Sequence, residues 1–122
     1  MGLKFSIKES EHCLITDFQK VRGDLLVVLG YFVSFCDKNS LECKVTNVVG
    51  KFPQSKSDTH PEGRAFDASL RGWNETKIKE CMTFMDMACG QLGAVSARDG
   101  KRRVIVRHDA GLGDHFHFQV RR

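Results

Sequence analysis

The stretch Asp114-His115-Phe116-His117-Phe118-Gln119-Val120 alternates polar and apolar side chains, and the expected fold depends on it. Successive side chains of a β-strand point to opposite faces of the sheet. A strand over His115–Val120 would send Phe116 and Phe118 into the core and both histidines to the other face. Aromatic rings on one side and imidazoles on the other are not typical of a solvated strand. The pattern therefore favours a sheet with a core on one face and a site on the other.

The rest of the chain indicates two helices and several more strands. Apolar residues at helical spacing predict a helix from about Thr16 to Cys36, ended by turn-type residues at 37–40. Asn74 is the expected N-cap of a second helix that runs to Gly90. Strands are expected over 42–49, 64–70 and 102–108, with a hairpin turn over 98–101 that contains Asp99-Gly100. This order predicts an α+β fold, a small antiparallel sheet with the helices packed on one side.

Length and composition indicate one soluble domain, residues 1–122. The net charge of +4 suits an ordinary solvated surface and also an anionic partner. The basic residues are scattered without interleaved aromatic residues, so we expect no nucleic-acid partner. The apolar run at 25–33 is too short to span a bilayer, and the first residues do not form a signal peptide. We therefore expect synthesis in the cytoplasm and no membrane insertion.

The five cysteines, an odd number with no C-x-x-C pair, are expected to be buried free thiols. Cys81, Met85 and Cys89 recur every four residues, which places them on one face of the second helix. A metal or disulfide role is the less favoured alternative.

The segment His60-Pro61-Glu62-Gly63-Arg64-Ala65-Phe66-Asp67 carries two candidate metal ligands. Gly63 permits a tight turn that folds His60 back towards Asp67, and the small Ala65 leaves space beside the carboxylate. Alone, His60 would be an ordinary loop histidine and Asp67 a charge at a strand edge. Two imidazoles and a carboxylate are the ligands that leave a zinc ion one open position for water. The same set suits non-haem iron, so the metal identity stays open.

Asp114 lies three residues before His117, so in a regular strand it would face away from that histidine. It can reach a metal-bound water only from an irregular turn before strand pairing begins. Gly111 and Gly113 make such a turn inexpensive. On these grounds alone, Asp114 as a simple turn residue is equally acceptable.

The two motifs together closely resemble those of zinc peptidases that cut peptidoglycan stem peptides. The matching patterns are His60-x-x-Gly63-x-Ala65-x-Asp67 and Asp114-x-x-His117. That family includes D-alanyl-D-alanine carboxypeptidases and dipeptidases and the L-alanyl-D-glutamate endopeptidases of bacteriophage endolysins, and hedgehog signalling domains share its fold. The resemblance covers about residues 45–120.

The resemblance implies a Zn²⁺ cofactor held by His60, Asp67 and His117. It also implies that Asp114 is the general base, which takes a proton from the zinc-activated water and passes it to the leaving amine. His115 matches a second histidine found near the metal in some relatives, where it contacts substrate or the transition state.

One departure concerns the substrate. Relatives commonly carry an upstream arginine that orients the substrate carboxylate, whereas the matching region here is Thr46-Asn47-Val48-Val49-Gly50-Lys51. Lys51 could replace the arginine only as a point charge, without bidentate geometry. Asn47 and Lys51 are therefore the candidate substrate-binding residues.

The resemblance implies a peptidoglycan peptide as the partner and action at the bacterial cell wall, after release by a separate pore or as part of a virion. The alternative is a hedgehog-like binding module that uses zinc structurally and has no peptidase activity.

Overall fold

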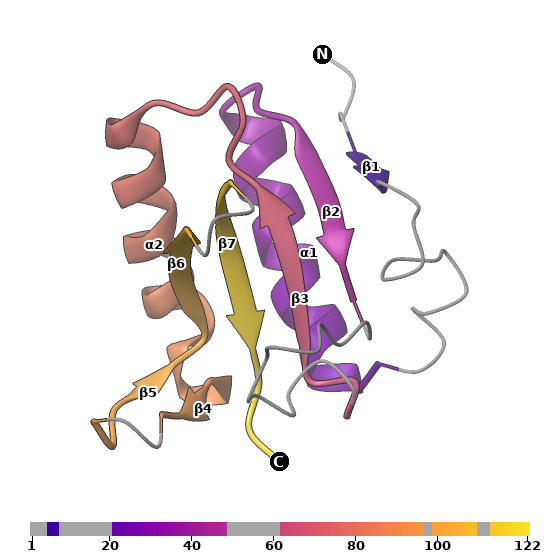
Figure 1. The fold of residues 1–122 in the computed structure, drawn as a ribbon, viewed down its shortest axis with the longest axis vertical. Coiled ribbons are helices and arrows are strands. Elements are labelled where there is room, and N and C mark those ends of the chain that lie inside the picture. Colours follow the sequence, from indigo (N-terminus) through magenta and orange to yellow (C-terminus); the bar gives the residue numbers. More distant parts are fainter. Residues whose placement is uncertain (1–4, 8–20, 49–61, 97–98, 110–112) are drawn as a thin grey trace.

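The described part of the chain is a sheet with two helices, and a computed structural model places residues 5–7, 21–48, 62–96, 99–109 and 113–122 of it (Figure 1). The elements are, in chain order, β1 (Phe5–Ile7), α1 (Gly23–Lys38), β2 (Cys43–Asn47), β3 (Ala65–Ser69), α2 (Glu75–Cys89), a 3-10 helix η2 (Gly90–Leu92), β4 (Ala94–Val95), β5 (Arg102–Arg103), β6 (Ile105–Asp109) and β7 (Asp114–Gln119).

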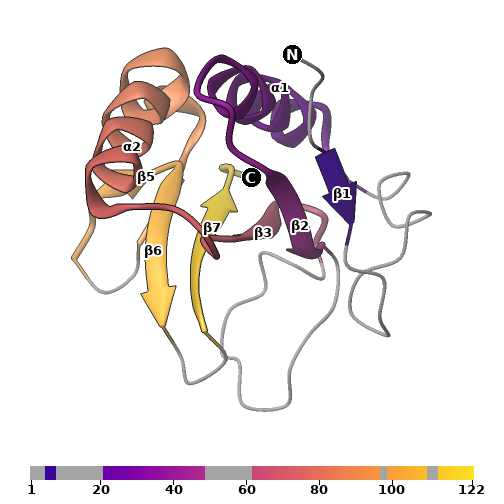
Figure 2. The ribbon, with the colours of Figure 1, turned by 90° about the horizontal axis from the view of Figure 1, so that it is seen from above.

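The main sheet has five strands in the order β1-β2-β3-β7-β6. β1 and β2 are parallel, and every other neighbouring pair in this sheet is antiparallel. β4 and β5 form a separate two-stranded ribbon. Seen from above, α1 and α2 lie on the same side of the sheet (Figure 2). The expected α+β arrangement, with helices on one side of a small and largely antiparallel sheet, is confirmed.

The alternation of β7 decides which residues face the helices. In the pairing with β3, Phe118 lies opposite Phe66 and Phe116 lies opposite Ala68, and all four are buried. The intervening pair is Asp67 opposite His117. The rings therefore form the floor of the core, as the sequence predicts, and the imidazoles lie on the face that carries no helix.

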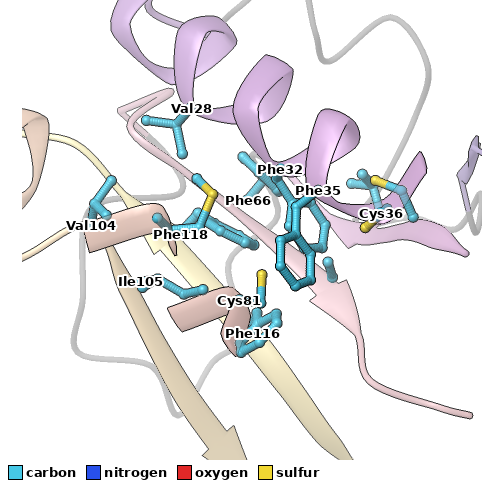
Figure 3. Close-up of a cluster of buried hydrophobic side chains, with 14 of the residues drawn as sticks. Val28, Phe32, Phe35, Cys36, Phe66, Cys81, Val104, Ile105, Phe116 and Phe118 are labelled. Atoms are coloured by element: carbon cyan, nitrogen blue, oxygen red, sulfur yellow. The ribbon is translucent and has the colours of Figure 1, made fainter. Parts of the chain in front are cut away.

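Phe32 of α1 is the centre of the aromatic core (Figure 3). Its ring centroid lies 4.6 Å from that of Phe118 and 6.0 Å from those of Phe116 and Trp73. Phe66 and Phe118 stack at 4.5 Å with an interplanar angle of 18°. Offset and edge-on contacts of this kind add to the free energy gained by burying the rings. The contacts of Phe32 hold α1 against β3 and β7, the two strands that carry the candidate site.

The ends of both helices and the start of α2 agree with the sequence signals, but α1 begins at Gly23, so Val21 and Arg22 are not in the helix predicted from about Thr16. Asn74 accepts a hydrogen bond from the backbone N–H of Lys77 at 2.8 Å, so its prediction as N-cap is confirmed. α2 ends at Cys89, next to the predicted Gly90. α1 ends at Lys38, two residues beyond the prediction, and residues 16–20 lie outside the described part.

Three features of the strands differ from the sequence prediction. β1 was not predicted, because three residues are too few to show a period. The strand expected over 102–108 is divided at the buried Val104, since β5 pairs with β4 whereas β6 pairs with β7. The last strand begins at Asp114, one residue earlier than expected. The hairpin at Asp99-Gly100 is present, with Gly100 at a φ of 70°.

The four described cysteines are free and buried, as expected. Burial raises the pKa of the Cys81 and Cys89 thiols. A hydrogen bond with Cys43 raises the pKa of Cys36. Cys36, Cys81 and Cys89 are therefore protonated and act as small apolar side chains of the core. Cys13 lies outside the described residues.

Replacing Phe32 with alanine should lower the free energy of unfolding by about 3–5 kcal/mol, because it opens a cavity where four aromatic rings meet. Urea denaturation followed by circular dichroism measures the loss. Leu26→Ala on the same helix is the control, since Leu26 is 46% exposed and should cost about 0.5 kcal/mol or less. Equal losses for the two variants would show that Phe32 does not organise the core.

Candidate metal centre

Asp67 and His117 form a hydrogen-bonded pair on the helix-free face of the sheet. They lie directly opposite each other on β3 and β7, and 2.9 Å separates Asp67 Oδ1 from His117 Nδ1. Their side chains are only 13% and 10% exposed. The two halves of the sequence motif, fifty residues apart, are thus brought into contact by strand register.

The far side of the His117 ring contacts Gln119 on the same strand. His117 Nε2 lies 3.2 Å from Gln119 Oε1, and Gln119 Nε2 donates to the backbone carbonyl of Arg103 at 3.1 Å. Sequence reasoning did not single out Gln119. The signal was available, because Gln119 shares the parity of His115 and His117 and so lies on the same face.

His115 lies beside this pair, with its Nε2 3.9 Å from Asp67 Oδ2. Its Nδ1 is 2.9 Å from the carbonyl oxygen of Gly113. A carbonyl oxygen can only accept, so this contact requires a proton on Nδ1. His115 therefore lies close to the candidate ligand Asp67, and its contact with substrate stays a prediction.

His108 is a third histidine on this face and was missed by the sequence analysis. It pairs with His115 across β6 and β7, and its ring centroid lies 5.8 Å from that of His115 and 5.6 Å from that of His117. The prediction of a strand over 102–108 did not give the register that pairs His108 with His115. His108 is exposed, unlike the ring of His117.

Asp114 is the first residue of regular β7, and it alternates to the same face as Phe116 and Phe118. Arg107 donates three hydrogen bonds to its carboxylate, at 3.0, 3.1 and 2.6 Å. The same guanidinium donates to Glu75 at 2.8 and 2.7 Å, at the start of α2. The Arg107 guanidinium holds the pKa of Asp114 below its ordinary value. The structure thus places Asp114 on the helix side, bound to an arginine, and does not bring it to Asp67.

The segment that follows His60 is anchored by a buried arginine. Arg64 donates to Glu62 at 2.8 Å and to the carbonyl of Val120 at 2.9 Å. Gly63 has a φ of 71°, which fits the tight turn expected there. These contacts fix the entry into β3 next to the end of β7. His60 itself lies outside the described residues, and so does Lys51.

Asn47 is paired with Asp67 across β2 and β3, where the register shifts by an irregularity between Val45 and Asn47. It is only 4% exposed, and its Oδ1 has no hydrogen-bond partner among the described residues. A buried acceptor without a donor is costly unless a bound group supplies one. The role of Asn47 in binding substrate stays a prediction.

The Asp67–His117 pair fits two ligands of a zinc ion. Oxygen and nitrogen ligands of one tetrahedral zinc lie about 3.4 Å apart, so the pair would need to open by about half an ångström. The hydrogen bond from a ligand histidine to a neighbouring acceptor, common at metal sites, is available at Nε2. Within the described residues, no three His, Cys, Asp or Glu side chains are arranged to hold a metal ion, and the expected third ligand, His60, is not among them.

Comparison with models of protein families, with curated proteins and with solved structures gives no match for this chain. The likeness to zinc peptidases therefore depends on the two short motifs. The geometry around Asp67 and His117 is the structural observation, independent of the motifs, against which this likeness can be judged.

Arg107→Gln should raise the pKa of Asp114 towards its ordinary value, because the variant removes the guanidinium that favours the carboxylate. A carboxyl ¹³C NMR titration measures the change. The folded-state pKa is lowered, so the pair contributes stability above the unfolded pKa near about 4 and loses it as the pH falls further. The difference in unfolding free energy between the two proteins should shrink on acidification.

Arg103→Gln is the matched control, because Arg103 pairs with Asp99 in the hairpin. It should raise the pKa of Asp99 from about 2 and leave that of Asp114 unchanged. An unshifted Asp114 in the Arg107→Gln protein would contradict the ion pair.

Proposed function

We propose that this protein is a zinc-dependent peptidase of hedgehog-like fold that hydrolyses peptide bonds in bacterial peptidoglycan stem peptides. The supporting observation is the Asp67–His117 pair, which joins the two halves of the peptidase motif at 2.9 Å on the open face of the sheet. Two short motifs can occur in one sequence by chance. A chance match gives no reason for their ligand positions to lie opposite each other on neighbouring strands.

In this proposal His60, Asp67 and His117 hold the zinc ion. When bound, zinc supplies a Lewis acid that activates water and polarises the scissile carbonyl. His115, next to Asp67, contacts the substrate. Asn47 offers its buried Oδ1 to an N–H of the peptide, and Lys51 attracts the substrate carboxylate as a point charge.

The proposed base, Asp114, has to leave Arg107 before it can act. An aspartate carboxylate is ionised at neutral pH and can accept a proton, but the lower pKa that Arg107 gives Asp114 makes it a weaker base while the ion pair lasts. Gly113, at a φ of 101°, immediately precedes it and allows the chain to turn. Substrate binding would have to supply the free energy that breaks the ion pair with Arg107.

A binding module without peptidase activity is the second candidate, and the position of Asp114 favours it. A carboxylate held by three hydrogen bonds on the helix side is not available as a base. In that case the zinc would organise a surface for a partner protein, as hedgehog domains largely use it.

The proposed place of action is the bacterial cell wall, reached by release through a separate pore or as part of a virion. No described helix is both long enough and apolar enough to cross a membrane. The net charge of +4 would favour contact with an anionic wall.

Purified protein should contain about one zinc ion per chain, and His60→Ala, Asp67→Asn and His117→Ala should each lose it. Each variant removes one of three ligands, which leaves too few donors for tight binding. Metal analysis of natively purified protein by mass spectrometry measures this and also distinguishes zinc from iron. Asp24→Asn, on the exposed first turn of α1, should keep the metal. A metal-free wild-type protein would end the proposal.

Asp114→Asn should keep zinc and reduce cleavage of peptidoglycan by at least about 100-fold, the usual contribution of a general base. Release of free amino groups from purified peptidoglycan of several chemotypes measures cleavage. Full activity of the variant would remove Asp114 from the mechanism. A zinc-loaded wild-type protein that cleaves none of the substrates would favour the binding module.

A further inference from the structure

Two basic runs that are far apart in the sequence, 101–103 and 121–122, lie close together in the fold. Arg121 donates its backbone N–H to the carbonyl of Leu92 at 2.9 Å. β4 begins two residues after Leu92, and it pairs with β5, which belongs to the first run. The two runs therefore meet at the end of the molecule where Figure 1 shows β4, β5 and the C-terminus. The basic surface that they form consists of Lys101, Arg102, Arg103, Arg121 and Arg122.

Gly93 allows this close approach of the two runs. It pairs with Val120, directly before the second run. A Cβ atom on Gly93 would lie 2.4 Å from the backbone carbonyl carbon of Arg103 in the first run. A side chain at this position would force the two backbones apart. The tight packing brings like charges together, and because like charges repel, it favours the binding of an anion.

The carboxylates around the basic surface neutralise only part of its charge. Arg103 pairs with Asp99 at 2.8 Å, and Arg122 pairs with Glu62 at 3.3 Å. The other three cations are exposed and form no ion pair with a carboxylate in the described part of the chain. They are Lys101, Arg102 and Arg121. The surface therefore keeps an excess of positive charge.

The Arg102 guanidinium is held in place without being neutralised. Its Nη1 donates to the carbonyl oxygen of Gly93 at 2.7 Å. A guanidinium carries five N–H donors in a planar fork, so this contact leaves several of them for an anion. A side chain that is ordered before binding loses less conformational entropy when the ligand arrives.

We propose that the basic surface binds the phosphodiester polymers of an anionic bacterial cell wall. Arginine matches phosphate oxygens with paired N–H donors. Proteins that bind single-stranded nucleic acid also stack its bases on aromatic rings. Among the described residues the exposed Phe and Tyr side chains are Phe5 and Tyr31, on β1 and α1 and outside this surface. The observations therefore favour a phosphate polymer without bases.

The choice of the cell wall as the source of the polymer rests on the proposed function, whereas the surface itself does not depend on the zinc site. The surface nevertheless adjoins that site. Gln119 contacts His117 at 3.2 Å and donates to the backbone carbonyl of Arg103 at 3.1 Å. A polymer bound to the basic surface would therefore lie beside the candidate site.

The double variant Arg102→Gln/Arg121→Gln should bind purified poly(glycerol phosphate) at least about 10-fold more weakly than the wild type at about 50 mM salt. Fluorescence anisotropy with an end-labelled polymer measures the affinity. The slope of log affinity against log salt concentration should fall by about 1 to 2, because two phosphate contacts are lost.

Two further double variants are the controls. Arg71→Gln/Lys79→Gln removes two exposed cations that lie outside the basic surface, and its affinity should stay within about threefold of the wild type. The variant in which Arg102 and Arg121 both become lysine retains both charges, so its salt slope should match that of the wild type. Circular dichroism checks that each variant folds, and Arg121→Gln alone replaces the first double variant if that one does not fold.

The outcomes separate this inference from the proposed function. A wild-type protein that does not bind the polymer at low salt, or an equal loss in the Arg71→Gln/Lys79→Gln control, would overturn the basic surface and leave a zinc peptidase standing. Tighter binding of DNA, or of vesicles with anionic lipid, than of poly(glycerol phosphate) would overturn the choice of partner. Metal-free protein that binds the polymer through Arg102 and Arg121 would support the surface even if the peptidase proposal fails.

Discussion

The stacking of Phe118 on Phe66, with Phe32 packed against both, is the interaction on which the candidate site depends. It fixes the register of β7 against β3 from the buried side. Because side chains alternate along a strand, the same register puts Asp67 opposite His117 on the other side. A slip of one residue would bury the imidazoles and expose the rings, at the cost of the aromatic core. The packing of one face thus specifies the chemistry of the other.

The sequence predicts the fold class well because the strongest signals are periodic. The alternation in β7 and the N-cap at Asn74 both appear in the structure. Other features depend on which strands pair, and the sequence of one strand does not show which strands lie beside it. These features are the strand order, the short β1 and the interruption at Val104. The pairing of Asp67 with His117 and the contacts of His108 depend on register and could not be derived from local pattern, whereas the contact of Gln119 with His117 lies within β7 and follows from parity.

The two acidic residues of the motif have opposite environments. Asp67 faces imidazoles on the open side, whereas Asp114 faces a guanidinium on the helix side. The alternation of side chains along β7 predicts that Asp114 and His117 lie on opposite faces of the sheet. Only an irregular turn before the strand would have brought them to the same face. The ion pair of Asp114 with Arg107 could not be anticipated from the motif, because Arg107 lies on another strand, β6. The same guanidinium also pairs with Glu75 at the start of α2. A motif can thus match in spacing while a neighbour from another strand changes what one of its residues can do.

The position of β7 within the sheet has a consequence for synthesis. β7 follows every other described strand in the chain, yet it lies between β3 and β6. Until its residues leave the ribosome, β3 and β6 lack a shared neighbour, and Phe32 lacks two of its partner rings. The sheet can therefore be completed only when this segment is inserted, after all the other described strands have been synthesised. His117 is part of this segment, so the pair of Asp67 and His117 cannot form in the nascent chain before that step.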